Sequence, residues 1–448
     1  MSDVINTPET DKFDVAIIGG GILGTTLAYW LSSYFQNAKI ALLEKENDVG
    51  LHTSSRNTGV VHRPFYLDPK EKKIFARSAL LSYPLWRKYT QAKGIPWEKI
   101  GTIEVAIDKS QLQILEKYRE WAFKNGMREE EIDFLSQKTT QKIEPNVICV
   151  SAFLCKTDVA TDFGLLTKSL KEDSQNKGVK FLMNSEVEVI KEAKNGLNLI
   201  CKNGAEISTR YLINCAGGNA TKIAHLLGVA REFTDLNFRG EYWVVDPCRA
   251  NLANHNIYSV PRHTDLPFLD PHWVVRWNGQ VEIGPNAVPV IGPYTYEGFF
   301  DNIAAVFKKF FEYPRRNKLL LLFNPEFLRL ATEEWEGSLS KKAMVGRIQR
   351  FLPKIKTEFL IKRGLAGIRS SVIDKNGTFV KEALEFFGPF SFHMINFNSP
   401  GATGVPAYTA YIMKKMINSH KLEHLKKRKV GKETMWDFSK ISDGFDGT

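Results

Sequence analysis

The sequence lacks the features that mark several specialised classes of protein. No apolar run reaches about 18 residues, so no transmembrane helix is expected. The first residues, MSDVINTPETDK, are polar and have no apolar core, so we do not expect a signal peptide. The cysteines are few, and no C-x-x-C pair occurs, so we predict neither a disulfide framework nor a metal site. They are Cys149, Cys155, Cys201, Cys215 and Cys248.

The few cysteines fit a protein of the reducing cytoplasm. The charge balance bears on which partners the protein could bind. Lys and Arg number 61 against 50 Asp and Glu, which gives a formal net charge of +11. Part of the excess lies near the C-terminus, in Lys421, Lys426, Lys427, Arg428, Lys429 and Lys432. We interpret this segment as a solvated tail; the alternative is peripheral binding to anionic lipid at the inner face of the membrane. Nucleic acid is disfavoured as a partner because no aromatic-interleaved basic face accompanies the charge.

Residues 13–44 carry the strongest motif. An apolar run, Val15–Ile18, is followed at once by GGGILG, a helical pattern, a second apolar run and a terminal acid, Glu44. A lone G-x-G-x-x-G is weak evidence, whereas strand, glycines, helix, strand and acid in this order indicate a dinucleotide-binding unit. The alternative is an ordinary βαβ unit with a glycine turn.

Each residue of this fingerprint has an expected task. Gly19 permits the tight turn, Gly21 lets a pyrophosphate approach the backbone, and Gly24 lets helix and strand pack closely. The N–H groups at the helix start face the phosphates, and Glu44, 20 residues past Gly24, accepts from a ribose hydroxyl.

The remainder of the chain alternates between two kinds of pattern. We expect helices over 71–90, 111–125, 134–143 and 162–177, and strands over 101–107, 179–183, 186–190, 197–201, 205–209, 211–219, 238–245 and 281–284. Asn203-Gly204 predicts a hairpin turn. Residues 398–404 open a last helix over 405–417, and its glycine-containing start suits an anionic part of a ligand. Residues 300–330 read as a basic, Phe-rich helical region; we favour packing on the domain over insertion into a membrane, because Pro314 and Pro325 interrupt it.

Several stretches together resemble the FAD-dependent D-amino-acid-oxidase superfamily. They are the fingerprint, Ser54–His62, Phe238–Tyr242 and Gly284–Val288, extended by Gly364–Arg369 and Ser399–Thr403. Within it the FRGEY and GPNAV pieces, with residues 267–286 between them, resemble the L-2-hydroxyglutarate dehydrogenase/oxidase group, and the likeness spans roughly residues 13–415.

The resemblance implies an α/β (α+β overall) fold and FAD as the cofactor. It implies a discontinuous Rossmann-like FAD domain, which we assign to 1–85, 151–235 and 360–448, and an antiparallel-sheet substrate domain, assigned to 86–150 and 236–359. The implied cofactor-binding residues are Gly19, Gly21, Gly24, Glu44, Lys45, Thr53, Ser54, Ser55, Val187, Ala216, Gly217, Gly401, Ala402 and Thr403. Thr53 or Ser54 is alternatively an N-cap of a following helix.

The resemblance also implies hydride transfer from the α-carbon of an L-2-hydroxy acid to flavin N5. Arg369 matches the family's carboxylate-binding position, and a planar guanidinium suits a carboxylate. Candidate bases, in order of preference, are His62, His272 and His393, because a histidine titrates near neutral pH. Further substrate-binding candidates are Arg276, Asn286, Tyr66 and Arg239, the first two for a second carboxylate.

One departure from the family leaves the substrate undecided. After His62 the group has a small residue and then Gly-Ile-Tyr-Tyr, whereas this chain has Arg63-Pro64-Phe65-Tyr66. A dicarboxylate such as L-2-hydroxyglutarate is favoured; the alternatives are an amino-acid or amine oxidase and a malate-type quinone-linked dehydrogenase. The electron acceptor, oxygen or a quinone, stays open, and a flavin-bearing scaffold without catalysis is the third class.

Overall fold

The computed structural model describes residues 11–261, 270–299, 304, 307, 309, 311–428 and 435–446. The first ten residues, Pro267, Lys429 and Lys432, which carry predictions made above, lie outside these ranges. The first layer is a parallel sheet centred on β1 (Asp11–Ile18), which pairs with β3 (Ile40–Leu43) on one side and β13 (Glu206–Asn214) on the other. β10 (Lys180–Leu182) and β23 (Ser391–Ile395) extend it in parallel.

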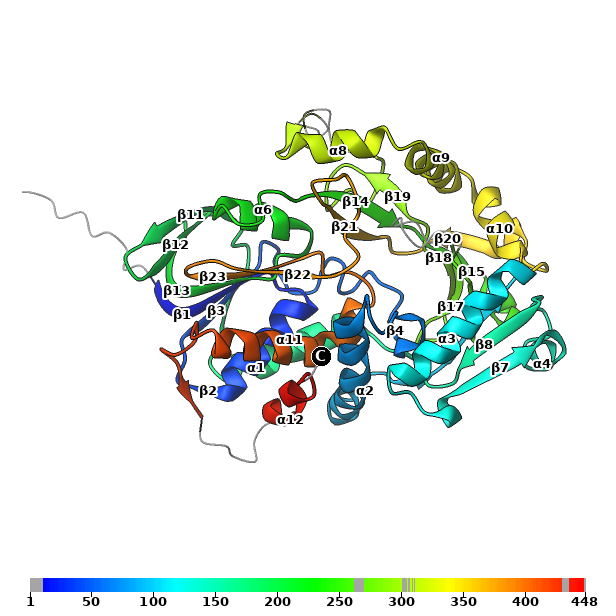
Figure 1. The fold of residues 1–448 in the computed structure, drawn as a ribbon, viewed down its shortest axis with the longest axis horizontal. Coiled ribbons are helices and arrows are strands. Elements are labelled where there is room, and N and C mark those ends of the chain that lie inside the picture. The colour runs from blue at the N-terminus through cyan, green and yellow to red at the C-terminus, as the bar shows by residue number, and fades with distance from the viewer. Residues whose placement is uncertain are drawn as a thin grey trace, which may run out of the picture.

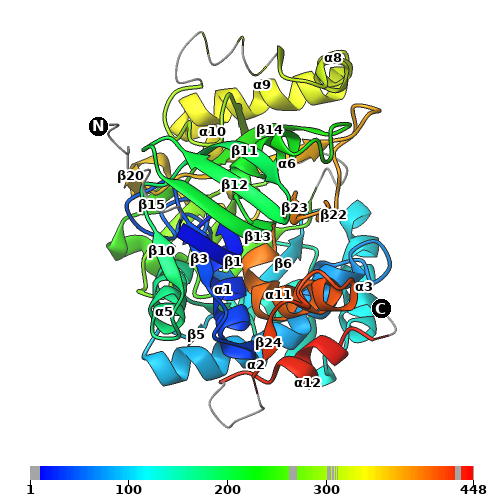
Figure 2. The same cartoon turned by 90° about the vertical axis from the view of Figure 1, so that its left-hand side faces the viewer.

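Both faces of this sheet are covered, as the continuous apolar run of β1 requires. Val15 and Ile17 pack in one core with helices α1 (Ile22–Tyr34) and α11 (Gly401–Asn418). Ala16 and Ile18 pack in another with the antiparallel strands β11 and β12. Those strands are β11 (Val187–Ala193) and β12 (Gly196–Cys201), and β22 (Leu384–Phe387) pairs with β23 at the same sheet. Figure 2 shows α1 and α11 side by side beneath the sheet.

Most predicted elements are present, and three predictions were wrong. The observed helices are α2 (Lys73–Lys93), α3 (Leu112–Lys124), α5 (Phe163–Gln175) and α6 (Ala220–Leu226). The expected helix over 134–143 begins as strand β7 (Ile132–Ser136), and α4 (Gln137–Ile143) starts only where Ser136 Oγ accepts from Thr139 N. Residues 205–215 give one strand, not two, because β13 pairs with β1 along its whole length. The expected strand over 238–245 divides after Gly240 into two strands of different sheets.

The second layer is an eight-stranded sheet in the order β20-β15-β18-β17-β16-β6-β8-β7. Its other strands are β6 (Thr102–Ala106), β8 (Ser151–Cys155), β15 (Trp243–Val245), β16 (Asn256–Ser259), β17 (His272–Val275), β18 (Val281–Gly284) and β20 (Leu360–Arg363). All neighbours are antiparallel except β16 and β6. β8, which follows the boundary expected at 150, and β20, which begins at the boundary expected at 360, both lie in this sheet. The division into domains stays a prediction.

A small third sheet lies between the two large ones (Figure 1). It consists of β19 (Val288–Val290), β14 (Thr234–Gly240) and β21 (Gly367–Ile373). β14 pairs with β21 over seven residues, which brings Phe238 opposite Arg369. Arg369, the predicted carboxylate-binding residue, therefore lies on the sheet between the two large ones.

The predicted helical region over 300–330 is described from Phe311 onward, apart from isolated residues. It forms α8 (Arg315–Leu322) and α9 (Pro325–Leu339), with Pro314 before the first helix and Pro325 opening the second. Phe327, Leu330 and Ala331 of α9 pack against the third sheet. Phe323, between the helices, is 81% exposed. Across the described ranges, no helix combines the length and apolarity that a membrane span needs.

Candidate active site

The glycine turn after β1 has one open position and two closed ones. Gly19 adopts φ +109°, and a Cβ there would lie 2.3 Å from the Cys215 carbonyl oxygen. A Cβ on Gly24 would lie 2.0 Å from the Gly19 carbonyl oxygen. At Gly21 a Cβ would meet only Ser54 Oγ, at 3.1 Å, and Gly21 lines the main cavity. Close packing therefore requires glycine at positions 19 and 24, whereas Gly21 leaves room for a ligand beside the start of α1.

Two side chains tie later segments to this turn. Glu44 Oε2 accepts from Gly20 N at 2.6 Å, so the acid at the end of β3 lies against the fingerprint loop. Ser54 Oγ accepts from Ile22 N at 2.9 Å, and Thr53 Oγ1 donates to Ile368 O at 2.9 Å. The N-cap of α1 is Gly21, and Ser54 accepts from an N–H of its first turn from another segment. No helix follows Ser54 among the described residues of its own segment, so the alternative interpretation of Thr53 or Ser54 as an N-cap was wrong.

A second helix start faces the same cavity. Gly401, Ala402 and Thr403 of α11 line it, as do Thr53, Ser54 and Gly217. Thr403 Oγ1 accepts from His62 N at 3.1 Å, so the helix start is fixed to the chain that carries His62. The other residues predicted to bind the cofactor do not line this cavity, and their roles stay predictions: Gly19, Gly24, Glu44, Lys45, Ser55, Val187 and Ala216.

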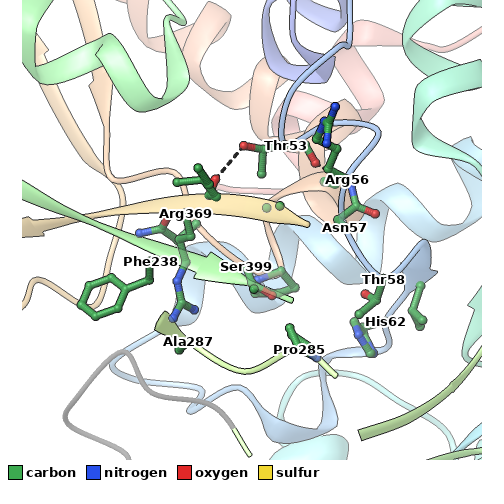
Figure 3. A pocket seen from close by; sticks show the side chains of 18 of the residues that line it. Thr53, Arg56, Asn57, Thr58, His62, Phe238, Pro285, Ala287, Arg369 and Ser399 are labelled. Carbon is green, nitrogen blue, oxygen red and sulfur yellow. Dashed lines mark hydrogen bonds between the residues drawn. The ribbon is translucent and has the colours of Figure 1, made fainter. Parts of the chain in front are cut away.

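The cavity has a volume of about 420 Å³ and lies where the layers meet. Its wall includes Gly21 from the fingerprint, His62, Glu104 from the second sheet and Arg369 from the third. Figure 3 shows His62 and Arg369 entering it from different elements. One cavity thus joins the dinucleotide turn to the polar groups predicted to act on a substrate.

His62 forms a buried pair with a residue that sequence analysis did not identify. His62 Nδ1 lies 2.9 Å from Oδ2 of Asp158, which is fully buried. Asp158 also accepts from Arg63 N at 2.6 Å and from Thr102 Oγ1 at 2.8 Å. The Cys155 thiol also donates to it, at 3.3 Å, so four donors hold this carboxylate in place, and it in turn orients the imidazole. A carboxylate behind a histidine is the arrangement that prepares a general base.

The other two histidines differ from each other. His272 lines the cavity, stacks on Tyr258 at 3.8 Å between ring centroids, and burial lowers its pKa to about 3. His393 does not line the cavity: its ring nitrogens lie 3.1 Å from Asn214 Nδ2 and 2.9 Å from Ser391 Oγ, inside the first sheet. Burial lowers the pKa of His393 to about 4. We therefore withdraw His393 as a candidate base, because it is a hydrogen-bonded core residue.

Arg369 lies in the cavity wall on β21, and burial lowers its pKa to about 10. Two other arginines predicted to bind substrate do not line the cavity. Arg276 donates from Nε to Glu282 Oε2 at 2.9 Å and from Nη1 to Asn57 O. It is committed to an ion pair, so the structure does not support it as the cation for a second carboxylate.

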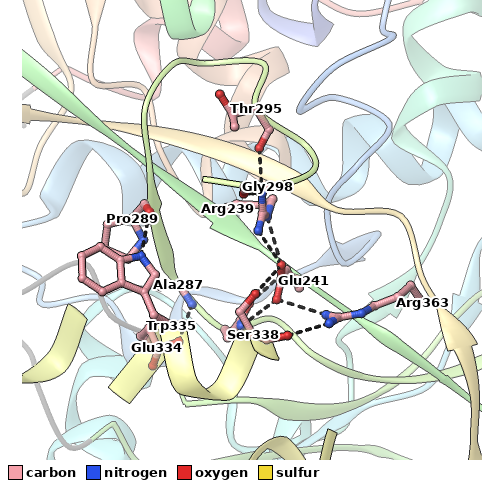
Figure 4. Close-up of polar contacts among 11 residues, drawn as sticks. Arg239, Glu241, Ala287, Pro289, Thr295, Gly298, Glu334, Trp335, Ser338 and Arg363 are labelled. Carbon is pink, nitrogen blue, oxygen red and sulfur yellow. Dashed lines mark hydrogen bonds and ion pairs between the residues drawn. The ribbon is translucent and has the colours of Figure 1, made fainter. Parts of the chain in front are cut away.

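Arg239 belongs to a buried network around Glu241 (Figure 4). Its Nη2 lies 2.8 Å from Glu241 Oε1, and Asn286 Nδ2 donates to Glu241 Oε2 at 3.1 Å. Ser338 Oγ and Arg363 Nη1 also bind this carboxylate, at 2.9 and 3.2 Å. Asn286 reaches the cavity wall but Arg239 does not, so the prediction that Arg239 contacts substrate is not supported.

The segment that departs from the family does not add a cation to the cavity. Arg63 is buried and pairs with Glu131, Nη2 to Oε1 at 2.8 Å, outside the cavity lining. Phe65 stacks on Phe153 at 5.0 Å between centroids, and Phe65 and Tyr66 both line the cavity. The exchange therefore alters the pocket through one ring, that of Phe65.

Sequence analysis missed two residues of the site, Glu104 and Asp158, and only Glu104 stood in a sequence pattern that could have revealed it. Glu104 is the single acid in the predicted strand GTIEVAI, and a charge within an apolar strand marks a position to examine. Asp158 lies in Lys156-Thr157-Asp158-Val159, which has no motif, and it reaches His62 across 96 residues of chain. Only the fold brings this pair together.

FAD fits the residues present. Two helix starts with backbone N–H groups, one bearing a glycine with room beside it, face one cavity, which suits a pyrophosphate and a ring that gains negative charge on reduction. Gly21 and Ser54 would hold the pyrophosphate, and Gly401 to Thr403 the ring. Together, the parallel sheet, the fingerprint turn and the antiparallel sheet closing the cavity define a dinucleotide-dependent oxidoreductase.

Comparison with known proteins agrees with this class. Residues 14–415 match the family described as FAD dependent oxidoreductase, and the chain belongs to it, with FAD as the cofactor. It is 30% identical to the mitochondrial L-2-hydroxyglutarate dehydrogenase of Caenorhabditis elegans, over 92% of this chain and 94% of that protein. Against the Escherichia coli K12 L-2-hydroxyglutarate dehydrogenase the identity is 27%, with 90% and 93% covered. The family resemblance noted in the sequence is confirmed.

Solved structures show the same fold. L-alpha-glycerophosphate oxidase from Mycoplasma pneumoniae, with FAD bound, superposes with a TM-score of 0.72 at 23% identity, covering 94% of this chain and 97% of that one. Glycine oxidase from Geobacillus kaustophilus has a TM-score of 0.66 at 16% identity, with 97% and 98% covered. The predicted Rossmann-like fold class is confirmed.

Proposed function

We propose that this chain oxidises an L-2-hydroxy acid to the 2-oxo acid, with L-2-hydroxyglutarate as the first substrate to test. The observation that carries the proposal is one cavity bearing both the His62–Asp158 pair and Arg369. The names of the relatives, L-2-hydroxyglutarate dehydrogenases from animals and bacteria, support the substrate class. When bound, FAD supplies the acceptor for the two electrons and the hydrogen that leave the substrate's C2.

His62 acts on the hydroxyl proton. The Asp158 carboxylate accepts a hydrogen bond from His62 Nδ1, which fixes the tautomer with the proton on Nδ1 and the lone pair on Nε2. Nε2 is then the base that takes the proton of the substrate hydroxyl as the C2 hydrogen departs. The buried carboxylate stabilises the imidazolium that forms.

Arg369 binds the substrate carboxylate next to C2. Its guanidinium offers two parallel donors, which fix the plane of a carboxylate and hence the direction of the C2–H bond. His272 stays neutral near pH 7 because burial lowers its pKa to about 3, so its role is hydrogen bonding rather than proton removal.

Stopped-flow reduction of the bound flavin tests the function. L-2-hydroxyglutarate should bleach the visible flavin band, whereas the D-enantiomer should not. Bleaching by L-amino acids or glycine, with none by hydroxy acids, would instead favour the amino-acid oxidase reading, which the glycine oxidase fold also accommodates. Reoxidation of the reduced enzyme by air or by a soluble quinone analogue separates oxidase from dehydrogenase.

We further propose a peripheral contact with anionic membranes, through the exposed apolar and basic residues of the α8 region. Phe311, Tyr313 and Phe323 are exposed there, with Arg315 and Arg316 exposed beside them. Apolar rings flanked by cations suit the interface of an anionic bilayer. The protein should float with vesicles that contain anionic lipid, and Phe323→Asp should abolish this. Phe123→Asp, on exposed α3, is the matched control.

A further inference from the structure

Glu104 is a carboxyl group in the middle of a buried strand. Its neighbours on β6, Ile103 and Val105, pack into the core of the second sheet, whereas Glu104 points the other way and lines the cavity. The residue is 5% exposed. An ionised carboxylate without a partner costs several kcal/mol in such a place, so a structural role alone does not explain an acid there.

The surroundings of Glu104 contain hydroxyls and another acid. Tyr258 on β16 and Phe153 on β8 are its neighbours across the sheet. Tyr66, from the turn after His62, and Tyr118, from α3, line the same wall. Within the described part of the chain, no hydrogen bond, ion pair or cation is recorded at the Glu104 carboxyl. Burial first and the charge of Asp158 second raise the pKa of Glu104 to about 8, so near pH 7 it is an uncharged O–H donor.

Two further polar atoms in this wall lack partners. Tyr258 Oη and His272 Nδ1 are buried and have no hydrogen-bond partner among the described residues. The two rings stack at 3.8 Å, which presents both atoms from one place. Buried polar groups are satisfied in more than about nine cases of ten, so several unsatisfied groups in one cavity wall indicate an oxygen-bearing ligand that completes them.

We propose that Glu104 is a specificity-determining residue: as a neutral carboxylic acid it donates a hydrogen bond to an oxygen at the end of the substrate far from C2. This inference rests on the proposed oxidation of a 2-hydroxy acid and adds how the far end is recognised. Glu104 lies on β6 of the second sheet and Arg369 on β21 of the third, so we assign the two groups to different parts of the cavity wall. A carboxylate or a hydroxyl would satisfy Glu104; an ammonium group would require it ionised.

Three acids of equal chain length test this, namely L-2-hydroxyglutarate, L-2,5-dihydroxypentanoate and L-2-hydroxypentanoate. In Glu104→Leu, the preference in kcat/KM for the first two over the third should fall by about tenfold or more, the worth of one hydrogen bond of about 1.4 kcal/mol. If kcat/KM falls for hydroxyglutarate alone, Glu104 donates to a carboxylate. If it falls for hydroxyglutarate and dihydroxypentanoate alike, Glu104 donates to either a carboxylate or a hydroxyl oxygen. Glu98→Leu, at an exposed acid, should keep the wild-type preference.

The pH dependence supplies a second arm that does not need Glu104→Leu to fold. In the wild type, KM for L-2-hydroxyglutarate and L-2,5-dihydroxypentanoate, the two acids with an oxygen far from C2, should rise as the pH passes about 8, where Glu104 ionises. Glu104→Gln keeps a neutral donor, so that rise should vanish while KM below pH 7 stays within a few-fold. FAD content and thermal melting check that each variant is folded.

Equal losses for all three acids in Glu104→Leu, or an unchanged alkaline rise in Glu104→Gln, would overturn the inference. So would a preference for L-2-hydroxy-5-aminopentanoate that Glu104→Gln removes, because Glu104 would then be an anion for a cationic substrate. These outcomes differ from failure of the proposed function, in which no hydroxy acid reduces the wild-type flavin at all.

Discussion

His62 and Asp158 form a buried imidazole–carboxylate pair, with Nδ1 2.9 Å from Oδ2. The partners are 96 residues apart in the chain. His62 follows β4 (Val60–Val61), and Asp158 directly precedes β9 (Val159–Ala160), which pairs with β4. That strand pair therefore sets the distance between base and carboxylate, and the Thr403 hydroxyl fixes the backbone of His62 to α11. Hydrogen bonds therefore hold both the ring and the backbone of His62.

Asp158→Asn should lower the rate of flavin reduction by about 10²–10⁴ with normal FAD content. The amide can donate to Nδ1, which would move the proton to Nε2 and remove the base. Stopped-flow reduction with a saturating hydroxy acid measures the effect. Thr102→Val is the matched control, because it removes another donor to Asp158 and leaves the pair with His62. A wild-type reduction rate in Asp158→Asn would refute the assignment.

The three histidines should separate in the same measurement. His62→Asn should lower the rate of reduction by about 10²–10⁴. His272→Asn should act mainly on KM, because its low pKa makes it a poor base, and His393→Asn should leave reduction unchanged apart from a loss of stability. If His62→Asn reduces flavin as fast as the wild type, the proposed proton transfer is wrong.

Arg369→Lys should lower kcat/KM for hydroxy acids by about ten- to a hundredfold, because the charge is kept and the planar pair of donors is lost. The FAD content should stay normal. Arg276→Lys is the matched control: Arg276 is paired with Glu282 outside the cavity lining, so kcat/KM should change much less. Equal losses in both variants would remove the special role of Arg369.

Sequence reasoning identified the cofactor fold because its signals are local. The strand, glycines, helix and acid of residues 13–44 are consecutive, and contacts within that unit or with the adjacent Cys215 require glycine at positions 19 and 24. The helix start at Gly401 was likewise visible as a glycine-rich segment before an apolar helix. The subgroup followed from resemblance, and relatives sharing about 30% of residues agree with it.

The substrate side was predicted less well, because its residues meet only through the fold. His393 has the same chemistry as His62, yet it is fully buried in the first sheet and bound to Asn214 and Ser391, and nothing in its neighbours in sequence reveals that. Arg239 and Arg276 were chosen as cations, but Glu241 and Glu282, close to them in sequence, bind them. An acid two residues further along the same segment, as in Arg239 and Glu241, or across a hairpin, as in Arg276 and Glu282, is a usable warning of such an ion pair.

Gly21→Val should abolish FAD binding and leave the fold intact, because its side chain would occupy the open space beside the start of α1. Gly24→Ala should instead destabilise the protein itself, because the new methyl group would lie 2.0 Å from the Gly19 carbonyl oxygen. FAD titration by fluorescence quenching and urea unfolding distinguish the two results. Tight FAD binding by Gly21→Val would contradict the assigned pyrophosphate position.

Glu104→Gln should stabilise the protein near neutral pH even though it alters the pocket. The folded protein holds the Glu104 proton until about pH 8, whereas the unfolded chain loses it near the ordinary value of 4.5. Between these values the unfolded state binds fewer protons, so the free energy of unfolding falls as the pH rises, by about 1.36 kcal/mol per unit at most. Glutamine has no such loss, so the variant should gain on the order of 1–3 kcal/mol at about pH 7.

Urea unfolding of FAD-loaded protein at about pH 4.5 and about pH 7 measures this, with exposed Glu98→Gln as the control. The gain should be present only at the higher pH; equal stability of variant and wild type at both pH values would show that Glu104 is not held neutral in the cavity wall.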